Sequence, residues 1–261
     1  MNEDVAVKVG KYEFNSRLFV GTGKYDTFEL MRDSLAASGT ELVTFVVRRV
    51  NIDKPDEESL LDYVDREKYT WLPNTAGCKT VDEVVRTAYL SREAAKSDLI
   101  KVEVIPDPET LLPDVVGSIE ATKVLADEGF TVMTYTTGDP IIAGKLIDAG
   151  AAAVMPLASP IGSGQGFVDY TYINIIIKRY GGVVPIVVDA GLGVPSDAAQ
   201  AMELGADAVL INTAIAKANN PIKMAQAMKL GVEAGRMAFL AGRMEKKQFA
   251  SASTPTEGMV K

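Results

Sequence analysis

The segments AGAAAVM (residues 149–155) and LGADAVL (residues 204–210) decide the fold, because each joins the end of one helix to the start of a strand. In both, a helical pattern ends at a glycine, Gly150 or Gly205, as helix C-termini commonly do. The short apolar run that follows predicts a strand. This self-similarity indicates a chain built from repeated βα units.

The same alternation of β-rich runs and helical patterns extends from residue 17 onward. Residues 80–95 place apolar side chains on one helix face, and Thr80 with Glu83 predicts a capping box at its start. Eight strands, each followed by a helix, in about 250 residues are typical of a (β/α)8 TIM barrel; a doubly wound open sheet usually has fewer strands. We predict strands at residues 17–21, 42–47, 69–72, 99–105, 131–135, 153–156, 184–189 and 208–212.

The ends of the chain differ from this repeating pattern. Within residues 1–16, the runs 5–9 and 12–14 predict a hairpin that closes the bottom of the barrel. Residues 245–261 are polar and rich in small side chains, which favours a mobile tail. No linker interrupts the chain, so we expect residues 1–261 to form a single domain.

The composition excludes several classes of function. The net charge of −8 would repel nucleic acid and anionic lipid, and no basic patch offsets it. The absence of histidine excludes Ser-His-Asp triads and histidine metal sites, and the single Cys78 excludes internal disulfides and cysteine zinc sites. The first residues lack the pattern of a signal peptide, and the longest uncharged run, 149–168, is broken by Gly, Pro and Ser. We therefore expect a cytoplasmic protein with no metal or cofactor.

Two glycine-rich motifs fail as nucleotide sites. GTGKY (residues 21–25) lacks the first glycine and the final Ser or Thr of a P-loop, since Leu18 and Tyr25 occupy those positions. GSGQG (residues 162–166) lacks the last glycine of the dinucleotide fingerprint, because Phe167 stands there. Neither motif predicts nucleotide binding.

Three segments at the ends of the last three predicted strands favour an anion site instead. In barrels, phosphate is commonly held by the loops after strands seven and eight. Residues 162–166 and 190–193 carry glycines that allow a ligand close to the backbone, and residues 212–214 follow the last strand, where helix-start amides attract anions. Because these segments contain no basic residue, we expect the phosphate to be held mainly by backbone amides rather than by a lysine or arginine cluster.

Two charged residues interrupt the apolar strand LIKVEVIPD (residues 99–107). In an extended chain, Lys101, Glu103 and Ile105 share one face. The pair either forms a neutral polar layer inside the barrel, or Lys101 is a Schiff-base amine whose pKa burial lowers and carboxylates raise. A lysine on an inner strand, beside a carboxylate and a phosphate site, suits imine chemistry on a sugar phosphate. Asp189, at the end of the seventh predicted strand, would supply a second proton-transfer group.

Two further polar sites are more ambiguous. RRVN (residues 48–51) either places an arginine at the mouth of the barrel or exposes it to solvent. Asp139 is expected to cap the helix that follows it.

Taken together, these segments resemble bacterial thiazole synthase, the enzyme family that builds the thiazole phosphate of thiamin. The resemblance covers nearly the whole chain, and the combination of motifs is specific although each is weak alone. One departure is Gly138, where an acidic residue is expected. The segments that carry the resemblance are residues 16–25, 48–51, 72–77, 101–105, 111–114, 155–166, 188–191, 212–214 and 228–236.

The resemblance implies a (β/α)8 barrel that acts on 1-deoxy-D-xylulose 5-phosphate. It further implies a glycine-derived imine as second substrate and sulfur from the thiocarboxylated C-terminus of a small ubiquitin-like carrier protein. It makes Lys101 the residue that forms an imine at the C2 ketone, and Glu103 and Asp189 the groups that transfer protons as the carbonyl migrates to C3, where sulfur attacks. By the same resemblance we expect a homo-oligomer, and substrate contacts at Gly162, Ala190, Gly191, Asn212 and Thr213.

Two alternatives remain open at this point. A lysine-dependent aldolase of sugar phosphates would share the fold and the imine but cleave a carbon–carbon bond. A non-catalytic barrel that only binds a carrier protein would form no imine. Whether glycine or tyrosine supplies the imine partner is not decided by the sequence.

Overall fold

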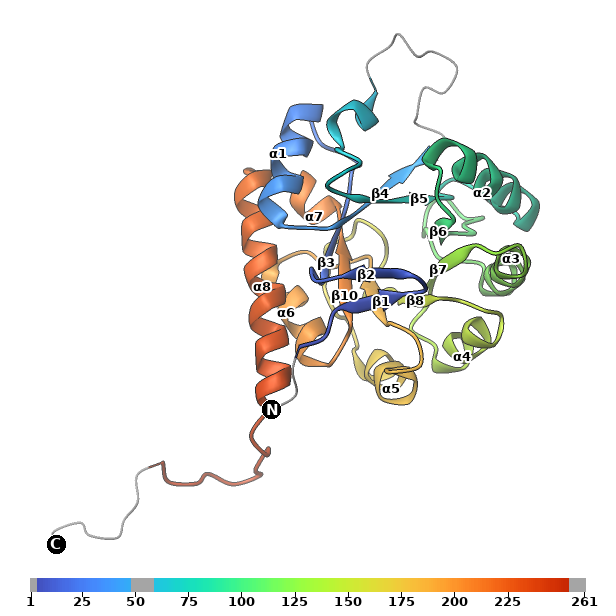
Figure 1. The fold of residues 1–261 in the computed structure, drawn as a ribbon. Helices are drawn as coiled ribbons and strands as arrows, with labels where there is room; N and C mark the ends of the chain where they lie inside the picture. Colours follow the sequence, from blue (N-terminus) through green and yellow to red (C-terminus); the bar gives the residue numbers. More distant parts are fainter. Residues whose placement is uncertain (1–3, 48–58, 254–261) are drawn as a thin grey trace, which may run out of the picture.

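The computed structural model describes residues 4–47 and 59–253, and its centre is a barrel of eight parallel strands (Figure 1). Hydrogen bonding follows the order β8-β7-β6-β5-β4-β3-β10-β9, and the bridges Val154–Ile186 and Leu157–Asp189 join β8 to β9. The predicted barrel is therefore confirmed. Its strands are β3 (Leu18–Gly21), β4 (Leu42–Val46), β5 (Thr70–Asn74), β6 (Leu99–Val102), β7 (Thr131–Thr136), β8 (Ala153–Pro156), β9 (Val187–Asp189) and β10 (Ala208–Ile211).

Helices follow most of the strands and cover the outside of the barrel. Within the described residues, β4 is followed by the 3-10 helix η2 (Leu60–Tyr63), and the predicted RRVN site lies outside the described residues. The other helices are α1 (Phe28–Ser38), α2 (Val81–Ala95), α3 (Val115–Asp127), α4 (Pro140–Asp148), α5 (Thr171–Tyr180), α6 (Pro195–Glu203), α7 (Thr213–Ala216) and α8 (Pro221–Ala241).

Side-chain caps fix where two of the helices begin. Asp139 accepts the N–H groups of Ile141 and Ile142 at the start of α4, which confirms its predicted role. Thr80 accepts the N–H of Glu83 at the start of α2. The Glu83 carboxylate accepts the N–H of Lys79, one residue before the position that a capping box uses.

Strand β6 shows how the barrel separates its two faces. Ile100 and Val102 point outward and join a buried cluster with helix residues such as Ala88 and Leu125. Leu99 points inward and joins a second cluster that fills the lower barrel with Phe19, Leu42, Leu72, Met133, Ala153 and Val187. Lys101 follows Leu99 on the inner face, one layer nearer the carboxyl ends of the strands. The apolar lower layers thus leave the charged residues at the mouth.

The antiparallel hairpin of β1 (Val7–Val9) and β2 (Tyr12–Phe14) closes the opposite end, as predicted. Val7, Val9 and Phe14 pack into the inner cluster, and the rings of Phe14 and Phe19 meet edge to face at 5.3 Å. Burying one such aromatic side chain contributes about 1.5–3 kcal/mol. Arg17 reinforces the closure by donating to the carbonyls of Val5 (2.5 Å) and Asp207 (2.6 Å).

Beyond α8, residues 242–253 have no helix or strand and extend away from the barrel (Figure 1). The mobility expected of residues 245–261 stays a prediction. Among the residues that the structure describes, no helix is long and apolar enough to cross a membrane.

Candidate active site

A cavity of about 510 Å³ opens at the carboxyl ends of the strands. It is where ligands bind in proteins of this architecture. The structure brings all eight residues expected at the site to its lining: Lys101, Glu103, Asp189, Gly162, Ala190, Gly191, Asn212 and Thr213. These residues come from four strand ends that are far apart in the sequence, so barrel closure assembles the site.

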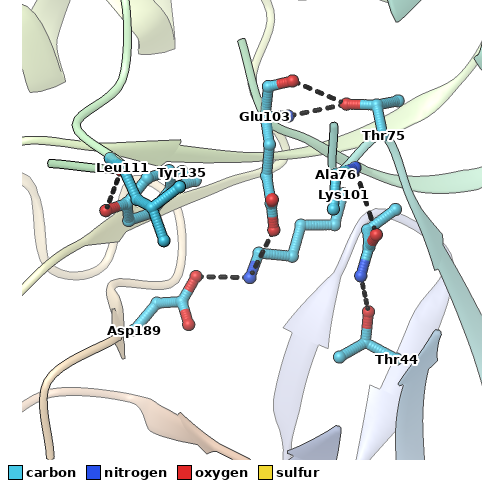
Figure 2. A network of polar contacts seen from close by, with 9 residues as sticks. Thr44, Thr75, Ala76, Lys101, Glu103, Leu111, Tyr135 and Asp189 are labelled. Carbon is cyan, nitrogen blue, oxygen red and sulfur yellow. Dashed lines mark hydrogen bonds and ion pairs between the residues drawn. The ribbon is translucent and has the colours of Figure 1, made fainter. Parts of the chain in front are cut away.

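Lys101 lies between two carboxylates, as Figure 2 shows. Its Nζ is 2.5 Å from Asp189 Oδ2 and 3.1 Å from Glu103 Oε1. All three side chains are buried, with 6–7% of their surface exposed. Buried charges of this kind require pairing, and the group carries a net charge of −1 when all three are ionised.

The two carboxylates decide the protonation of Lys101. Burial lowers the pKa of Lys101, whereas the negative charges of Asp189 and then Glu103 raise it, and their hydrogen bonds add to the rise. The net pKa lies above the ordinary value of 10.5. Lys101 is therefore an ammonium at neutral pH. A nucleophilic amine arises only when a proton has been removed from it.

Glu103 lies just beyond the end of β6, where a side chain replaces the neighbouring strand as its partner. The β5–β6 pairing ends at Asn74 and Lys101. Thr75 Oγ1 then donates to the Glu103 carbonyl (2.9 Å) and accepts the Glu103 N–H (2.8 Å), as Figure 2 shows. These two hydrogen bonds to its backbone hold Glu103 on the inner face of the barrel.

Tyr135 lies close to the charged group. Its ring centroid is 5.8 Å from Lys101 Nζ, and its hydroxyl donates to the carbonyl of Leu111 (3.3 Å). Burial, and then the charges of Asp189 and Glu103, raise the pKa of the Tyr135 phenol well above its usual range. The phenol therefore stays protonated and anchors Leu111, which lines the cavity with a left-handed backbone (φ 52°).

Two polar residues beside Lys101 were not predicted as site residues. Asn74 pairs with Lys101 across β5 and β6, and its Nδ2 donates to Thr44 Oγ1 (3.0 Å). Its Oδ1 accepts the N–H of Ala76 (3.2 Å). Both Asn74 and Thr44 line the cavity, and their place at strand ends is the sequence signal that marks them.

The left-handed backbone of the turn after β9 is explained by packing as well as by access for a ligand. Ala190 and Gly191 are both left-handed (φ 66° and 81°). A Cβ on Gly191 would lie 2.0 Å from Ser159 Oγ and 2.6 Å from the Ser159 backbone nitrogen and oxygen. The glycine is thus required by the contact between the turns after β8 and β9, whether or not a ligand is bound.

Fewer backbone N–H groups are free to bind a phosphate than the sequence suggests. Asp197 accepts the N–H groups of Gly193 (2.8 Å) and Val194 (3.2 Å) at the start of α6. That helix end is therefore already occupied by a carboxylate and does not attract a phosphate. The N–H groups of Gly162, Gly191 and Thr213, by contrast, have no protein acceptor within the described part of the chain.

Lys24 is a cavity residue that was not predicted as part of the site. It lines the cavity although it follows the first barrel strand, β3. Strands β3 and β10 are neighbours, so the loop after β3 lies beside Asn212. A Cβ on Gly21 would lie 2.7 Å from the Cβ of Asn212, so glycine is needed for this close contact.

The described residues contain no group of three or more Cys, Asp or Glu side chains placed to hold a metal ion. The chemistry that the arrangement supports directly is amine addition to a carbonyl, with two carboxylates to accept and return protons.

Known proteins resemble this chain over nearly its whole length. The sequence model of the family described as "Thiazole biosynthesis protein ThiG" matches residues 8–255. A thiazole synthase of Thermodesulfovibrio yellowstonii is 55% identical over 260 residues, which is 100% of both chains. One of Solibacter usitatus is 57% identical over 248 residues, 95% of both chains. A chain of the Amycolatopsis orientalis BexX/CysO complex has a TM-score of 0.82 at 34% identity, over 94% of this chain and 99% of that one. The protein therefore belongs to the thiazole biosynthesis protein ThiG family.

Proposed function

We propose that this member of the thiazole synthase family condenses 1-deoxy-D-xylulose 5-phosphate, held as an imine on Lys101, with a glycine-derived imine and carrier-bound sulfur. Family membership identifies an enzyme of thiamin biosynthesis. The finer proposal of an imine mechanism rests on one observation: a buried lysine lies between two carboxylates at the inner end of an open cavity.

The first step is loss of a proton from the Lys101 ammonium. Asp189 Oδ2, at 2.5 Å, is the nearest base. The amine then attacks the C2 ketone of the sugar, a nitrogen–carbon bond forms, and the ketone oxygen leaves as water. The protonated imine carries the same positive charge as the original ammonium. Glu103 and Asp189 therefore stabilise the imine by the same Coulombic attraction that stabilises the ammonium.

The carboxylates then move the carbonyl along the chain. Removal of the C3 proton from the imine gives an enol with a carbon–carbon double bond between C2 and C3. Return of a proton to C2 leaves a ketone at C3, to which sulfur adds. Removal of the C3 proton needs a base and protonation of C2 needs an acid, each within hydrogen-bond reach of the bound sugar. Glu103 and Asp189 flank the nitrogen that holds the sugar, and a carboxylate that has accepted the first proton is the acid for the second transfer.

The far end of the sugar carries the phosphate. We assign its contacts to the turns after β8, β9 and β10, through Gly162, Ala190, Gly191, Asn212 and Thr213. The free N–H groups of Gly162, Gly191 and Thr213 support this assignment, because a phosphate supplies acceptors for them.

Sulfur would arrive on a second protein. One related barrel was solved as the BexX/CysO complex, so a protein of this fold forms a complex with another protein. The cavity is open at the mouth, which allows an extended C-terminal tail to reach Lys101. We infer that the thiocarboxylate of a small carrier protein enters this way, and we expect the barrel itself to be a homo-oligomer.

The alternatives make different predictions. An aldolase would form the same imine but release carbon–carbon cleavage products without a sulfur donor. A non-catalytic barrel would form no imine. The family to which the chain belongs favours thiazole formation over both.

Reductive trapping tests the proposal. The protein is incubated with 1-deoxy-D-xylulose 5-phosphate and borohydride, and its peptides are mapped by mass spectrometry. We expect one labelled residue, Lys101, no label in Lys101→Met, and full labelling in the control Lys145→Met on helix α4. Label on Lys24 or Lys145 with Lys101 unmodified would overturn the site assignment.

A further inference from the structure

We propose that Lys24 binds the phosphate of the sugar substrate, from the loop after the first strand of the barrel. This inference rests on the proposed function and adds a residue to it. In this proposal, backbone amides and one positively charged side chain bind the phosphate together.

The first step is where Lys24 lies. Strand β3 pairs with β10, with Val20 opposite Ile211, so the loop after β3 meets the turn after β10. The Nζ of Lys24 is 3.4 Å from the position that a Cβ of Gly162 would occupy. The same position is 3.8 Å from Thr213 Oγ1. Lys24, Gly162 and Thr213 therefore surround one small space at the edge of the cavity.

The second step is charge. Four charged residues line the cavity: Lys24, Lys101, Glu103 and Asp189. The last three form the ion-paired group with a net charge of −1, which repels a phosphate dianion. Lys24 makes no ion pair or side-chain hydrogen bond with any residue in the described ranges. The nearby Lys217, by comparison, is paired with Asp26 at 3.1 Å. Lys24 is thus the lining cation whose charge is available to an incoming anion.

The third step is the backbone. Lys24 has a left-handed conformation (φ 69°), which is unfavourable for a residue with a Cβ. Such conformations persist where function or packing requires them. Here the preceding loop is held against Asn212, since a Cβ on Gly23 would lie 3.1 Å from Asn212 Nδ2. The loop is thereby fixed with Lys24 beside the free N–H groups of Gly162 and Thr213.

The fourth step is the lack of another strong donor. The amides at the start of α6 are occupied by Asp197, which adds negative charge on that side. A phosphate bound by the remaining amides alone would keep most of its charge uncompensated. A lysine ammonium compensates it and forms charge-assisted hydrogen bonds.

Equilibrium binding tests the inference with a readout that does not depend on product formation. We would titrate 1-deoxy-D-xylulose 5-phosphate by calorimetry into the wild type and into Lys24→Gln, Lys24→Arg and Lys217→Gln. We expect Lys24→Gln to raise the Kd about 10–100-fold, the loss of one charged hydrogen bond, and Lys24→Arg to recover most of it. Lys217→Gln removes the same charge from a residue that does not line the cavity and should leave the Kd within about twofold.

Competition with inorganic phosphate identifies the group that Lys24 recognises. Phosphate should raise the apparent Kd of the wild type markedly and that of Lys24→Gln far less. An unchanged Kd in Lys24→Gln, or equal competition by phosphate in both proteins, would overturn the role of Lys24. If the sugar phosphate binds as expected but is not trapped on Lys101, the imine proposal fails and the phosphate site stands. If the wild type does not bind it, both fail.

Discussion

The ammonium of Lys101 lies 2.5 Å from the carboxylate of Asp189, although their strands, β6 and β9, are not neighbours in the barrel. The contact crosses the interior above a layer of apolar side chains. In this setting of low polarity, the carboxylate both keeps the lysine charged and lies ready to take its proton. The same pair thus governs the stability of the resting site and the start of the proposed reaction.

Asp189→Asn should shift the pH dependence of imine formation to lower pH. Removing the charge lowers the raised pKa of Lys101, so a larger fraction of amine is neutral at a given pH. The wild-type midpoint lies above about pH 10, so we expect the rising part of the curve of trapping rate against pH to move down by about 1–3 pH units. Thiazole formation should drop about 10²–10⁴-fold, because a proton acceptor is lost. Cyanoborohydride trapping between pH 6.5 and 10, with product analysis, measures both.

Glu103→Gln is the matched comparison. Its carboxylate is farther from the Lys101 nitrogen, 3.1 Å against 2.5 Å, and raises the pKa of Lys101 less. The rising part of the trapping curve should therefore move to lower pH by a smaller amount than in Asp189→Asn. A shift of that curve to higher pH in either variant, or thiazole formation at the wild-type rate, would contradict the proposed roles.

Lys101→Met should destabilise the protein at neutral pH and much less in mild acid. The variant leaves two carboxylates buried side by side without a cation, at a cost of about 3–5 kcal/mol. As the pH falls from 7 to 5, one carboxylate takes up a proton in the folded state before it does so in the unfolded chain, so the stability of the variant rises. In the wild type, the stabilisation from the raised pKa of Lys101 is complete below about pH 10.5 and does not change in this range.

Urea unfolding at both pH values measures the difference between variant and wild type. Lys123→Met is the control, since Lys123 pairs with Asp127 at the surface, with both side chains more than 60% exposed. It should change stability by less than about 1 kcal/mol at either pH. A Lys101→Met penalty that is equal at pH 7 and pH 5 would show that unpaired charge is not its cause.

The fold could be predicted because its signals are local and repeated. The sequence pattern of each βα unit predicts one strand and one helix. Few architectures can accommodate eight such units in one chain. The errors lie at element ends. The fourth strand was predicted through residue 105 but pairs only to Val102, because Thr75 takes over as the partner of Glu103. The seventh was predicted from residue 184 but begins at Val187.

The site was predictable where its residues stand at strand ends, and not where it depends on closure of the barrel. Lys101 and Glu103 share an inner face by the period of the strand, and the structure places them together. Lys24 follows the first strand and reaches a site made by the last three, a proximity that exists only because β3 and β10 pair. The occupation of the α6 start by Asp197 is likewise a side-chain orientation that the sequence does not specify.

Thr75→Val should separate proton transfer from imine formation. The variant keeps the shape of the side chain but leaves the N–H and carbonyl of Glu103 without their partner, at a cost of about 1–3 kcal/mol. Glu103 then loses its fixed position, so thiazole formation should fall while Lys101 is still trapped. Thr40→Val is a close control, because Thr40 Oγ1 bonds the carbonyl (2.8 Å) and N–H (3.3 Å) of Leu42 in the same way at the other end of a strand. It should lose stability but keep the ratio of product to trapped imine. If the two variants lose product formation equally, Thr75 has only a structural role.

Gly162→Ala and Gly191→Ala should fail in different ways, although both glycines are left-handed and line the cavity. An added methyl at Gly162 meets only Lys24 Nζ at 3.4 Å and Thr213 Oγ1 at 3.8 Å, which are ordinary contacts. The variant should lose about 1–2 kcal/mol of stability from its backbone conformation. It should also bind the sugar phosphate at least about tenfold more weakly, because the methyl fills the space assigned to the phosphate.

At Gly191 the added methyl would press on the backbone of Ser159 at 2.6 Å, and backbone cannot turn aside as a side chain does. We expect a loss of about 3 kcal/mol or more from strain and overpacking together, with the turns after β8 and β9 displaced. Thermal unfolding of both variants measures the loss of stability, and calorimetry measures their affinity for the sugar phosphate. Gly191→Ala with wild-type stability would contradict the close contact with Ser159, and Gly162→Ala with wild-type affinity would place the phosphate elsewhere in the cavity.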